Sequence, residues 1–260
     1  MVNKKFKKEI IFGLILIILE ANTVSGYTYN LNYSNTLNPG NWLYVGGSGP
    51  GNYSTITEAL FYANNGDTIF VYDDSSPYYE QVNINKEVFL IGENTKTTIV
   101  DASNSTEVIF VKANNVTIKG FTITNGTVGI QITGDYVIIK NNIICNNYNY
   151  GISISGFGDS NIISENTISD NGHEEPNVTT GYGGIYLALT ATNKIKNNNF
   201  INNSNTNAFF FKSFLNIWMH NYWDKPRIFP YPILGLQAII PPIFWLQFDL
   251  KPRLSPFVMP

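Results

Sequence analysis

The chain has 260 residues with a formal net charge of −3 at pH 7, and only 13% of its residues are charged. Its content of aromatic and β-branched residues excludes an intrinsically disordered chain, and the lack of a basic stripe argues against nucleic-acid binding. Asn, Thr, Ser, Gly and Tyr dominate instead, which favours an all-β surface protein.

Residues 1–26 have the layout of a secretory signal peptide. Four lysines precede the apolar run Ile10–Leu19, and small residues follow as far as Gly26. The run is shorter than the roughly 20 residues of a membrane-spanning helix. We therefore expect a secreted or cell-surface protein with no membrane span in the mature chain. An uncleaved N-terminal anchor is the alternative, because Glu20 and Asn22 make an imperfect cleavage region.

Residues 27–43 are polar and are predicted to form a linker, and a short helix is expected near residues 55–64. The helix would begin at a Ser or Thr cap and stop before Gly66. Its apolar residues fall on one helical face: Ile56, Ala59, Leu60 and Ala63. We expect this helix to cover the N-terminal end of the β-structure that follows, where strand groups would otherwise be unpaired.

Residues 44–224 contain a repeat that is clearest in five aligned segments. These are VTIKGFTITN (116–125), VIIKNNIICN (137–146), NIISENTISD (161–170), NKIKNNNFIN (193–202) and NIWMHNYWDK (216–225), with offsets of 21, 24, 32 and 23 residues. One aligned column holds Ile118, Ile139, Ile163, Ile195 and Trp218, and a second holds Ile123, Ile144, Ile168, Phe200 and Trp223. Alternating apolar residues in a repeat of this length predict the stacked short strands of a parallel β-helix, a solenoid that forms one unit.

Asparagine occupies one point of four consecutive repeats, at Asn142, Asn166, Asn198 and Asn221. We expect these amides to stack as a structural ladder at a turn, each one bonding to the next coil and to local backbone. Chance alignment is the alternative, because the chain contains 36 Asn. The apolar columns aligned in the same frame favour the ladder.

An insertion at residues 171–183 lengthens the third of these repeats, and acidic residues and a histidine gather near it in the sequence. The candidate contacts to a carbohydrate or another ligand are Asp159, Asp170, His173 and Glu174, with Glu165 and Glu175 close by. An acid/base pair is a second interpretation of this group. A solvated polar loop without a binding role is the third.

Residues 225–260 form a tail that is rich in Pro and aromatic residues. It contains both arginines of the chain, Arg227 and Arg253. The apolar stretch Ile228–Phe248 is interrupted by prolines that a helix does not tolerate. We expect an extended tail that packs along the coils or closes their C-terminal end.

Several segments resemble the opening of pectin-lyase-like right-handed β-helix proteins: YSTITEAL (53–60), GDTIFV (66–71), YYEQVNI (78–84), VFLIGEN (88–94) and VTIKGFTI (116–123). The later coils and the element at 216–224 resemble the NosD-type β-helix family of archaeal and bacterial surface proteins. The resemblance covers about residues 44–224 and implies a right-handed β-helix. Lyases, hydrolases, esterases and non-catalytic adhesins all use this fold, so the resemblance implies little about chemistry.

The sequence lacks the complete catalytic sets of the family's enzymes. Pectate-lyase-like elimination resembles Ca²⁺-assisted proton abstraction by Lys or Arg, but no Arg precedes Arg227. Lys119 and Lys140 are expected to stack in one column without neighbouring carboxylates in their rungs. The Gly-His-Gly segment of polygalacturonases and the Gln, Asp and Arg set of pectin methylesterases are also missing. We therefore predict no catalytic residue.

No metal or cofactor is predicted either. Copper delivery, which the NosD resemblance implies, would need several soft or imidazole ligands. The chain beyond residue 26 offers scattered ones: His173, His220, Met219, Met259 and Cys145. Met219 and His220 are adjacent, so in a strand they would point to opposite faces. As the single cysteine, Cys145 also excludes an intramolecular disulfide.

The leading functional prediction is a secreted or cell-surface protein without catalytic activity, with a structural or carbohydrate-binding role in the envelope. Its expected partners are polysaccharide or other envelope proteins. A polysaccharide lyase or glycoside hydrolase acting on acidic polysaccharide is one alternative. A NosD-like periplasmic protein connected with copper is the other.

Overall fold

The computed structural model describes residues 40–259 except 174–181, 205 and 240–241. The predicted signal peptide, most of the predicted linker and Glu174 lie outside the described residues. Across the described part of the chain, no helix is both long and apolar enough to cross a membrane.

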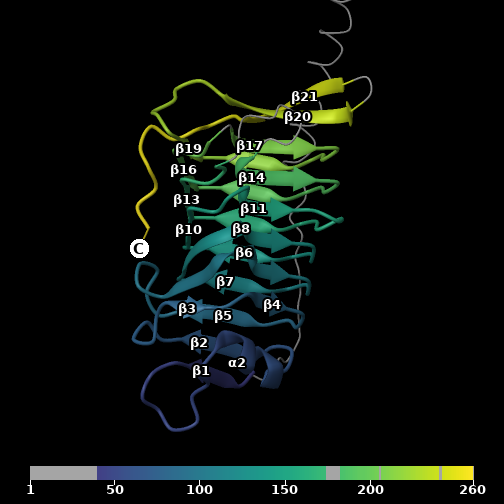
Figure 1. The fold of residues 1–260 in the computed structure, drawn as a ribbon. Helices are drawn as coiled ribbons and strands as arrows, with labels where there is room; N and C mark the ends of the chain where they lie inside the picture. The colour runs from purple at the N-terminus through teal and green to yellow at the C-terminus, as the bar shows by residue number, and fades with distance from the viewer. Residues whose placement is uncertain (1–39, 174–181, 205, 240–241, 260) are drawn as a thin grey trace, which may run out of the picture. The chain divides into compact units, whose positions relative to one another are not determined.

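The described chain is mostly β-structure. Apart from β21, its strands form three stacks in which each strand pairs in parallel with its counterparts in neighbouring coils (Figure 1). The first stack contains β1 (Trp42–Val45), β2 (Thr68–Val71), β5 (Phe89–Gly92), β7 (Thr117–Lys119), β9 (Ile138–Lys140), β12 (Ile162–Ser164), β15 (Lys194–Lys196) and β18 (Ile217–Met219). The second contains β3 (Tyr78–Tyr79), β10 (Ile143–Cys145), β13 (Thr167–Ser169), β16 (Asn199–Ile201) and β19 (Tyr222–Trp223). The third contains β4 (Val82–Ile84), β11 (Tyr150–Ile154), β14 (Gly183–Ala188), β17 (Thr206–Phe211) and β20 (Tyr231–Ile239). Two long strands, β6 (Ile99–Val111) and β8 (Thr122–Ile132), turn the corner and belong to both the second and third stacks.

The two predicted apolar columns are confirmed by the strand register. The first joins Ile118, Ile139, Ile163, Ile195 and Trp218. The second joins Ile123, Ile144, Ile168, Phe200 and Trp223. All ten side chains are buried, because alternate strand positions face the interior and stack on the same positions of the coils above and below.

A residue with positive φ makes the corner between the first and second stacks in each later coil. These residues are Gly120, Asn141, Glu165, Asn197 and His220, with φ between 53° and 85°. Gly, Asn and His are among the residues that enter this region of backbone space most readily. The corner therefore explains part of the chain's high Asn content.

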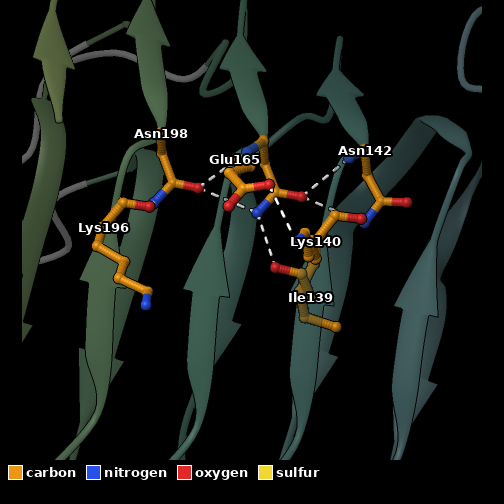
Figure 2. Close-up of polar contacts among 7 residues, drawn as sticks. Ile139, Lys140, Asn142, Glu165, Lys196 and Asn198 are labelled. Atoms are coloured by element: carbon orange, nitrogen blue, oxygen red, sulfur yellow. Dashed lines mark hydrogen bonds and ion pairs between the residues drawn. The ribbon is translucent and has the colours of Figure 1, made fainter. Parts of the chain in front are cut away.

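The residue after each corner is buried: it is Phe121 after Gly120, and after the other four corners it is an Asn of the ladder. Asn142 donates its backbone N–H and its Nδ2 to Oδ1 of Asn166, at 3.0 and 3.2 Å, and Asn166 donates likewise to Asn198, at 3.1 and 3.0 Å (Figure 2). Asn198 continues the chain to Asn221, at 3.0 and 3.1 Å. Each Nδ2 also donates to a backbone carbonyl of the preceding coil. All four side chains are fully buried, so the ladder satisfies amides that water does not reach.

The helix predicted near residues 55–64 is α2 (Ile56–Tyr62), which buries Ile56, Ala59 and Leu60. Its N-cap is Thr55, whose hydroxyl accepts the N–H of Glu58 at 3.0 Å. The Glu80 carboxylate accepts the N–H groups of Ile56 and Thr57, both at 2.8 Å. Lys86 Nζ donates to three carbonyls near the C-terminal end of the helix, at 2.6 to 2.9 Å. The early coils thus hold both ends of the helix.

The tail forms an antiparallel hairpin of β20 and β21 (Pro242–Asp249), and β20 stacks on β17. Tyr231 of β20 stacks on the Trp223 ring at 4.2 Å, and Trp223 stacks on Phe200 at 4.5 Å. Residues 250–259 then run back beside the second stack (Figure 1). There the Asn199 side chain accepts the N–H of Phe257 at 2.6 Å and donates to its carbonyl at 2.8 Å.

Candidate functional site

A hollow of about 700 Å³ lies at the corner between the second and third stacks. Its lining is mostly amide and hydroxyl groups with one aromatic ring and one imidazole: Asn104, Asn125, Gly126, Thr127, Asn146, Tyr148 and His173. The Tyr148 side chain is 50% exposed and His173 is also exposed. This first hollow therefore presents hydrogen-bonding groups and the face of an aromatic ring to solvent.

A second Asn ladder, which the sequence analysis did not identify, holds the backbone beneath this hollow. Asn147 donates its N–H and Nδ2 to Oδ1 of Asn171, at 3.1 and 3.0 Å, and Asn171 donates to Oδ1 of Asn203, at 3.2 and 3.0 Å. Asn147 Oδ1 also accepts the N–H of Gly126 at 3.1 Å. The signal was present in the sequence, because these three residues lie five positions after Asn142, Asn166 and Asn198.

Two carboxylates beside the first hollow are engaged in hydrogen bonds with side-chain amides. Asp101 accepts Nδ2 of Asn125, a lining residue, at 2.8 Å and the N–H of Ser103 at 2.7 Å. Asp170 accepts Nδ2 of Asn202 at 2.6 Å. These bonds fix the carboxylates in the turns from which they come.

Cys145 is not an activated nucleophile. Burial raises the pKa of its thiol, and the neighbouring Asp170 carboxylate raises the pKa further. The hydrogen bonds with Thr124 and Asn146 lower the pKa, but each contributes less than burial does, so the pKa stays raised. The thiol therefore stays protonated at neutral pH, whereas a nucleophilic cysteine needs the thiolate.

A second hollow of about 380 Å³ lies on another corner, beyond the third stack. It is more apolar, with a carboxylate and an amine at its edges: Phe157, Asp159, Leu189, Thr190, Ala191, Lys212, Phe214 and Gln237. Asp159 Oδ1 accepts the N–H of Ala191 from the next coil at 2.6 Å. The Asp159 carboxylate thus links its own turn to the turn of the next coil by a hydrogen bond.

The structure distributes the predicted ligand contacts over different places. His173 lines the first hollow, Asp170 lies beside that hollow, and Asp159 lines the second hollow. Glu174 lies outside the described residues. Asp159 and His173 are separated because strands β12 and β13 lie between them in the chain. The chain turns a corner between these two strands.

The predicted lysine column is present, since Lys119 pairs in register with Lys140. Lys140 has a carboxylate neighbour from the following coil, because Glu165 Oε2 lies 3.2 Å from Lys140 Nζ (Figure 2). The expectation of no neighbouring carboxylate was therefore wrong for Lys140, because stacking of the coils brings in a carboxylate from 25 positions further along the chain. Among the described residues, no three His, Cys, Asp or Glu side chains group closely enough to hold a metal ion.

Residues 43–222 match the family described as the right-handed β-helix region. The chain belongs to the right-handed β-helix family. The match confirms the handedness that the resemblance implied. No curated protein matches the sequence of this β-helix.

Several solved structures are similar to this β-helix. Pectate lyase Pel9A aligns with a TM-score of 0.50 and 14% identity over 70% of this chain, which corresponds to 54% of the lyase. An alginate lyase from Paenibacillus sp. str. FPU-7 aligns with a TM-score of 0.43 and 14% identity, over 64% of this chain and 72% of the other. Pectin methylesterase PemA from Erwinia chrysanthemi aligns with a TM-score of 0.41 and 13% identity, over 78% and 85%. At such identities the similarity shows the fold alone.

Proposed function

We propose that this β-helix is a non-catalytic carbohydrate-binding protein of the cell exterior and that the first hollow binds the sugar. The observation that supports this most is the lining of the hollow. Amides and a hydroxyl from successive turns line it together with the exposed ring of Tyr148. Planar polar groups bond to sugar hydroxyls, and an aromatic face packs against the apolar face of a sugar ring.

The charge around the hollow favours a neutral sugar. Asp101 and Asp170 lie beside it, and no lysine or arginine is among its described lining residues. An acidic polysaccharide would meet like charge at this place. The two carboxylates are bound by Asn125 and Asn202, which supports a role in holding the turns rather than in acid/base chemistry.

Glycan-array binding tests the proposal directly. The wild-type chain should bind a subset of neutral glycans, and Tyr148→Ala and His173→Ala should each weaken that binding, by roughly tenfold for the tyrosine. Tyr136→Ala is the matched control, because Tyr136 is 60% exposed on another turn and does not line the hollow. Turnover of a uronic-acid polymer by the wild-type chain would overturn the proposal in favour of a polysaccharide lyase or hydrolase.

The exterior location is part of the same proposal. Its support is the signal-peptide layout of residues 1–26 and the low content of charged residues, 13% of the chain. Membership of the NosD-type group is proposed on the later repeats and the element at 216–224. Fractionation of cells that produce the native chain tests the location, and recovery from the cytoplasm alone would contradict it.

A further inference from the structure

The C-terminal hairpin carries a large apolar surface beyond the last coil. The exposed side chains are Phe229 at 75%, Ile243 at 49%, Phe244 at 54%, Trp245 at 48%, Leu246 at 45% and Leu250 at 63%. Exposed apolar residues on this scale mark an interaction surface rather than an ordinary solvated face.

The position of β21 makes this surface unusual. Successive strand residues point to opposite faces, and each of Ile243–Leu246 is exposed, so both faces of the strand are apolar. β20 lies between β17 and β21, so β21 lies beyond the last strand of the third stack (Figure 1). Along Ile243–Leu246, no described strand other than β20 pairs with it.

The charges around the hairpin are one-sided. No charged residue lies between Arg227 and Asp249, while Lys225 and Arg227 precede the hairpin and Lys251 and Arg253 follow it. Tyr231 pairs with Asp249, so both cationic segments meet at the base of the hairpin. Asp249 is fully buried, and the exposed Asp224 accepts hydrogen bonds from Asn202 and Asn207 at 2.6 Å each. The end of a chain with net charge −3 is therefore locally cationic.

We propose that this hairpin docks on an anionic lipid surface, with β21 lying at the boundary between headgroups and acyl chains. If a second copy of the chain were the partner, it would cover only one edge or one face of β21, and the other apolar face would stay exposed to solvent. A lipid surface surrounds both faces, and the flanking cations then meet acidic headgroups. Aromatic side chains favour this boundary, where water and headgroups also remain available to the outer-edge backbone groups of β21.

Vesicles made with a brominated phosphatidylcholine and phosphatidylglycerol test the proposal with the full chain. The bromines quench tryptophans that contact the acyl chains, so bound wild-type protein should lose fluorescence from Trp245. That loss should disappear in Trp245→Phe and persist in Trp42→Phe, whose residue is 54% exposed in β1. The buried Trp218 and Trp223 give a constant background.

Binding itself supplies the second measurement. Phe244→Ser with Trp245→Ser should lower affinity for these vesicles by tenfold or more, while Trp42→Ser should leave it unchanged. Vesicles of phosphatidylcholine alone, or high salt, should weaken binding of the wild type. Equal quenching in wild type and Trp245→Phe would overturn the proposal. So would a dimer in light scattering that the double variant dissociates, since β21 would then be an interface between copies.

Discussion

The direction of the hydrogen bonds in the first Asn ladder determines which residue can end it. Every Asn donates toward the following coil, so the last one, Asn221, needs an acceptor. Oδ2 of Asp249 accepts the N–H and Nδ2 of Asn221, at 2.9 and 3.0 Å, and Nε1 of Trp223 at 3.1 Å. Oδ1 accepts the N–H groups of His220 and Lys251, both at 3.2 Å. A carboxylate has only acceptors, so the ladder stops there without a new unpaired donor.

Removing a middle amide of this ladder should be costly. Asn166→Leu keeps a similar volume but removes the acceptor of the buried Asn142 backbone N–H and one of the partners of Asn142 Nδ2. It also removes the Nδ2 donor that bonds to Asn198 Oδ1 and to the Ile139 carbonyl. The expected loss in the free energy of unfolding is on the order of 1–3 kcal/mol. Asn83→Leu makes the same change at an exposed position of β4 and should cost less than about 0.5 kcal/mol. Denaturant melts compare the two, and equal stability of both variants would show that the ladder contributes nothing.

Tyr78 gives the early coils a dependence on alkaline pH. Burial, the main cause, raises its pKa from 10.0 to about 12, and its hydroxyl donates to the Tyr72 carbonyl at 2.7 Å. The folded state holds the proton more tightly than the unfolded state, so this contribution to stability is complete below pH 10 and is lost as the pH rises toward 12.

The variant Tyr78→Phe isolates this contribution. It should lower the free energy of unfolding by about 1 kcal/mol at neutral pH. The gap between wild type and variant should shrink as the pH rises from 10 toward 12. Other tyrosines titrate in both proteins and cancel in the difference. Unfolding curves that stay parallel across this window would contradict the prediction.

At the scale of whole elements, the strands and contacts that recur in every coil were the easiest to predict from the sequence. Ile139 and Ile163 must face the same interior because each occupies the same place in its coil, so alignment alone reveals their contact. The hairpin of β20 and β21 has no such repeat. Its place follows from the fit of Tyr231 on Trp223 and of Asp249 beneath the ladder, and contacts of that kind are invisible in a linear pattern.

The candidate site was harder to predict for a related reason. Proximity in sequence suggested that Asp159 and His173 belong together, but a coil turns a corner between them. The first hollow instead gathers residues from different coils, such as Asn104, Asn125 and Tyr148. A search for offsets of about one coil would have found Asn125 and Tyr148, which are 23 positions apart.

Besides its N-cap Thr55, the helix α2 has two N-terminal N–H groups that bond to Glu80 of the neighbouring coil. Glu80→Ala removes the acceptor of the Ile56 and Thr57 N–H groups and a negative charge at the positive end of the helix. We expect a loss of about 1–2 kcal/mol and faster hydrogen exchange of the helix amides. Glu107→Ala, a change of the same kind in β6, should leave that exchange unaltered. Unchanged exchange in both variants would mean that Thr55 caps the helix without help.

At the scale of the described solenoid, each coil contacts mainly the coils next to it, and stability is then a sum of local terms. Both ends are closed by elements outside the repeat, α2 at one and the hairpin at the other. A carboxylate joins each of these elements to the coils. The partly buried Glu80 accepts the N–H of Ile56 in α2, and the buried Asp249 of the hairpin accepts the N–H of Asn221. The two ends should therefore open independently.

Hydrogen exchange mapped along the chain tests this independence. Asp249→Ala removes the acceptor of the Asn221 backbone N–H and of Trp223 Nε1. Exchange should therefore accelerate in β18, β19 and the hairpin while β5 and β7 keep their protection. Glu80→Ala should give the reverse pattern, with faster exchange in α2 and unchanged protection of β18. Local opening of this kind follows when few contacts join distant coils. Uniform acceleration along all coils in either variant would instead show that the solenoid unfolds as one cooperative unit, and the nearest-neighbour description would fail for this chain.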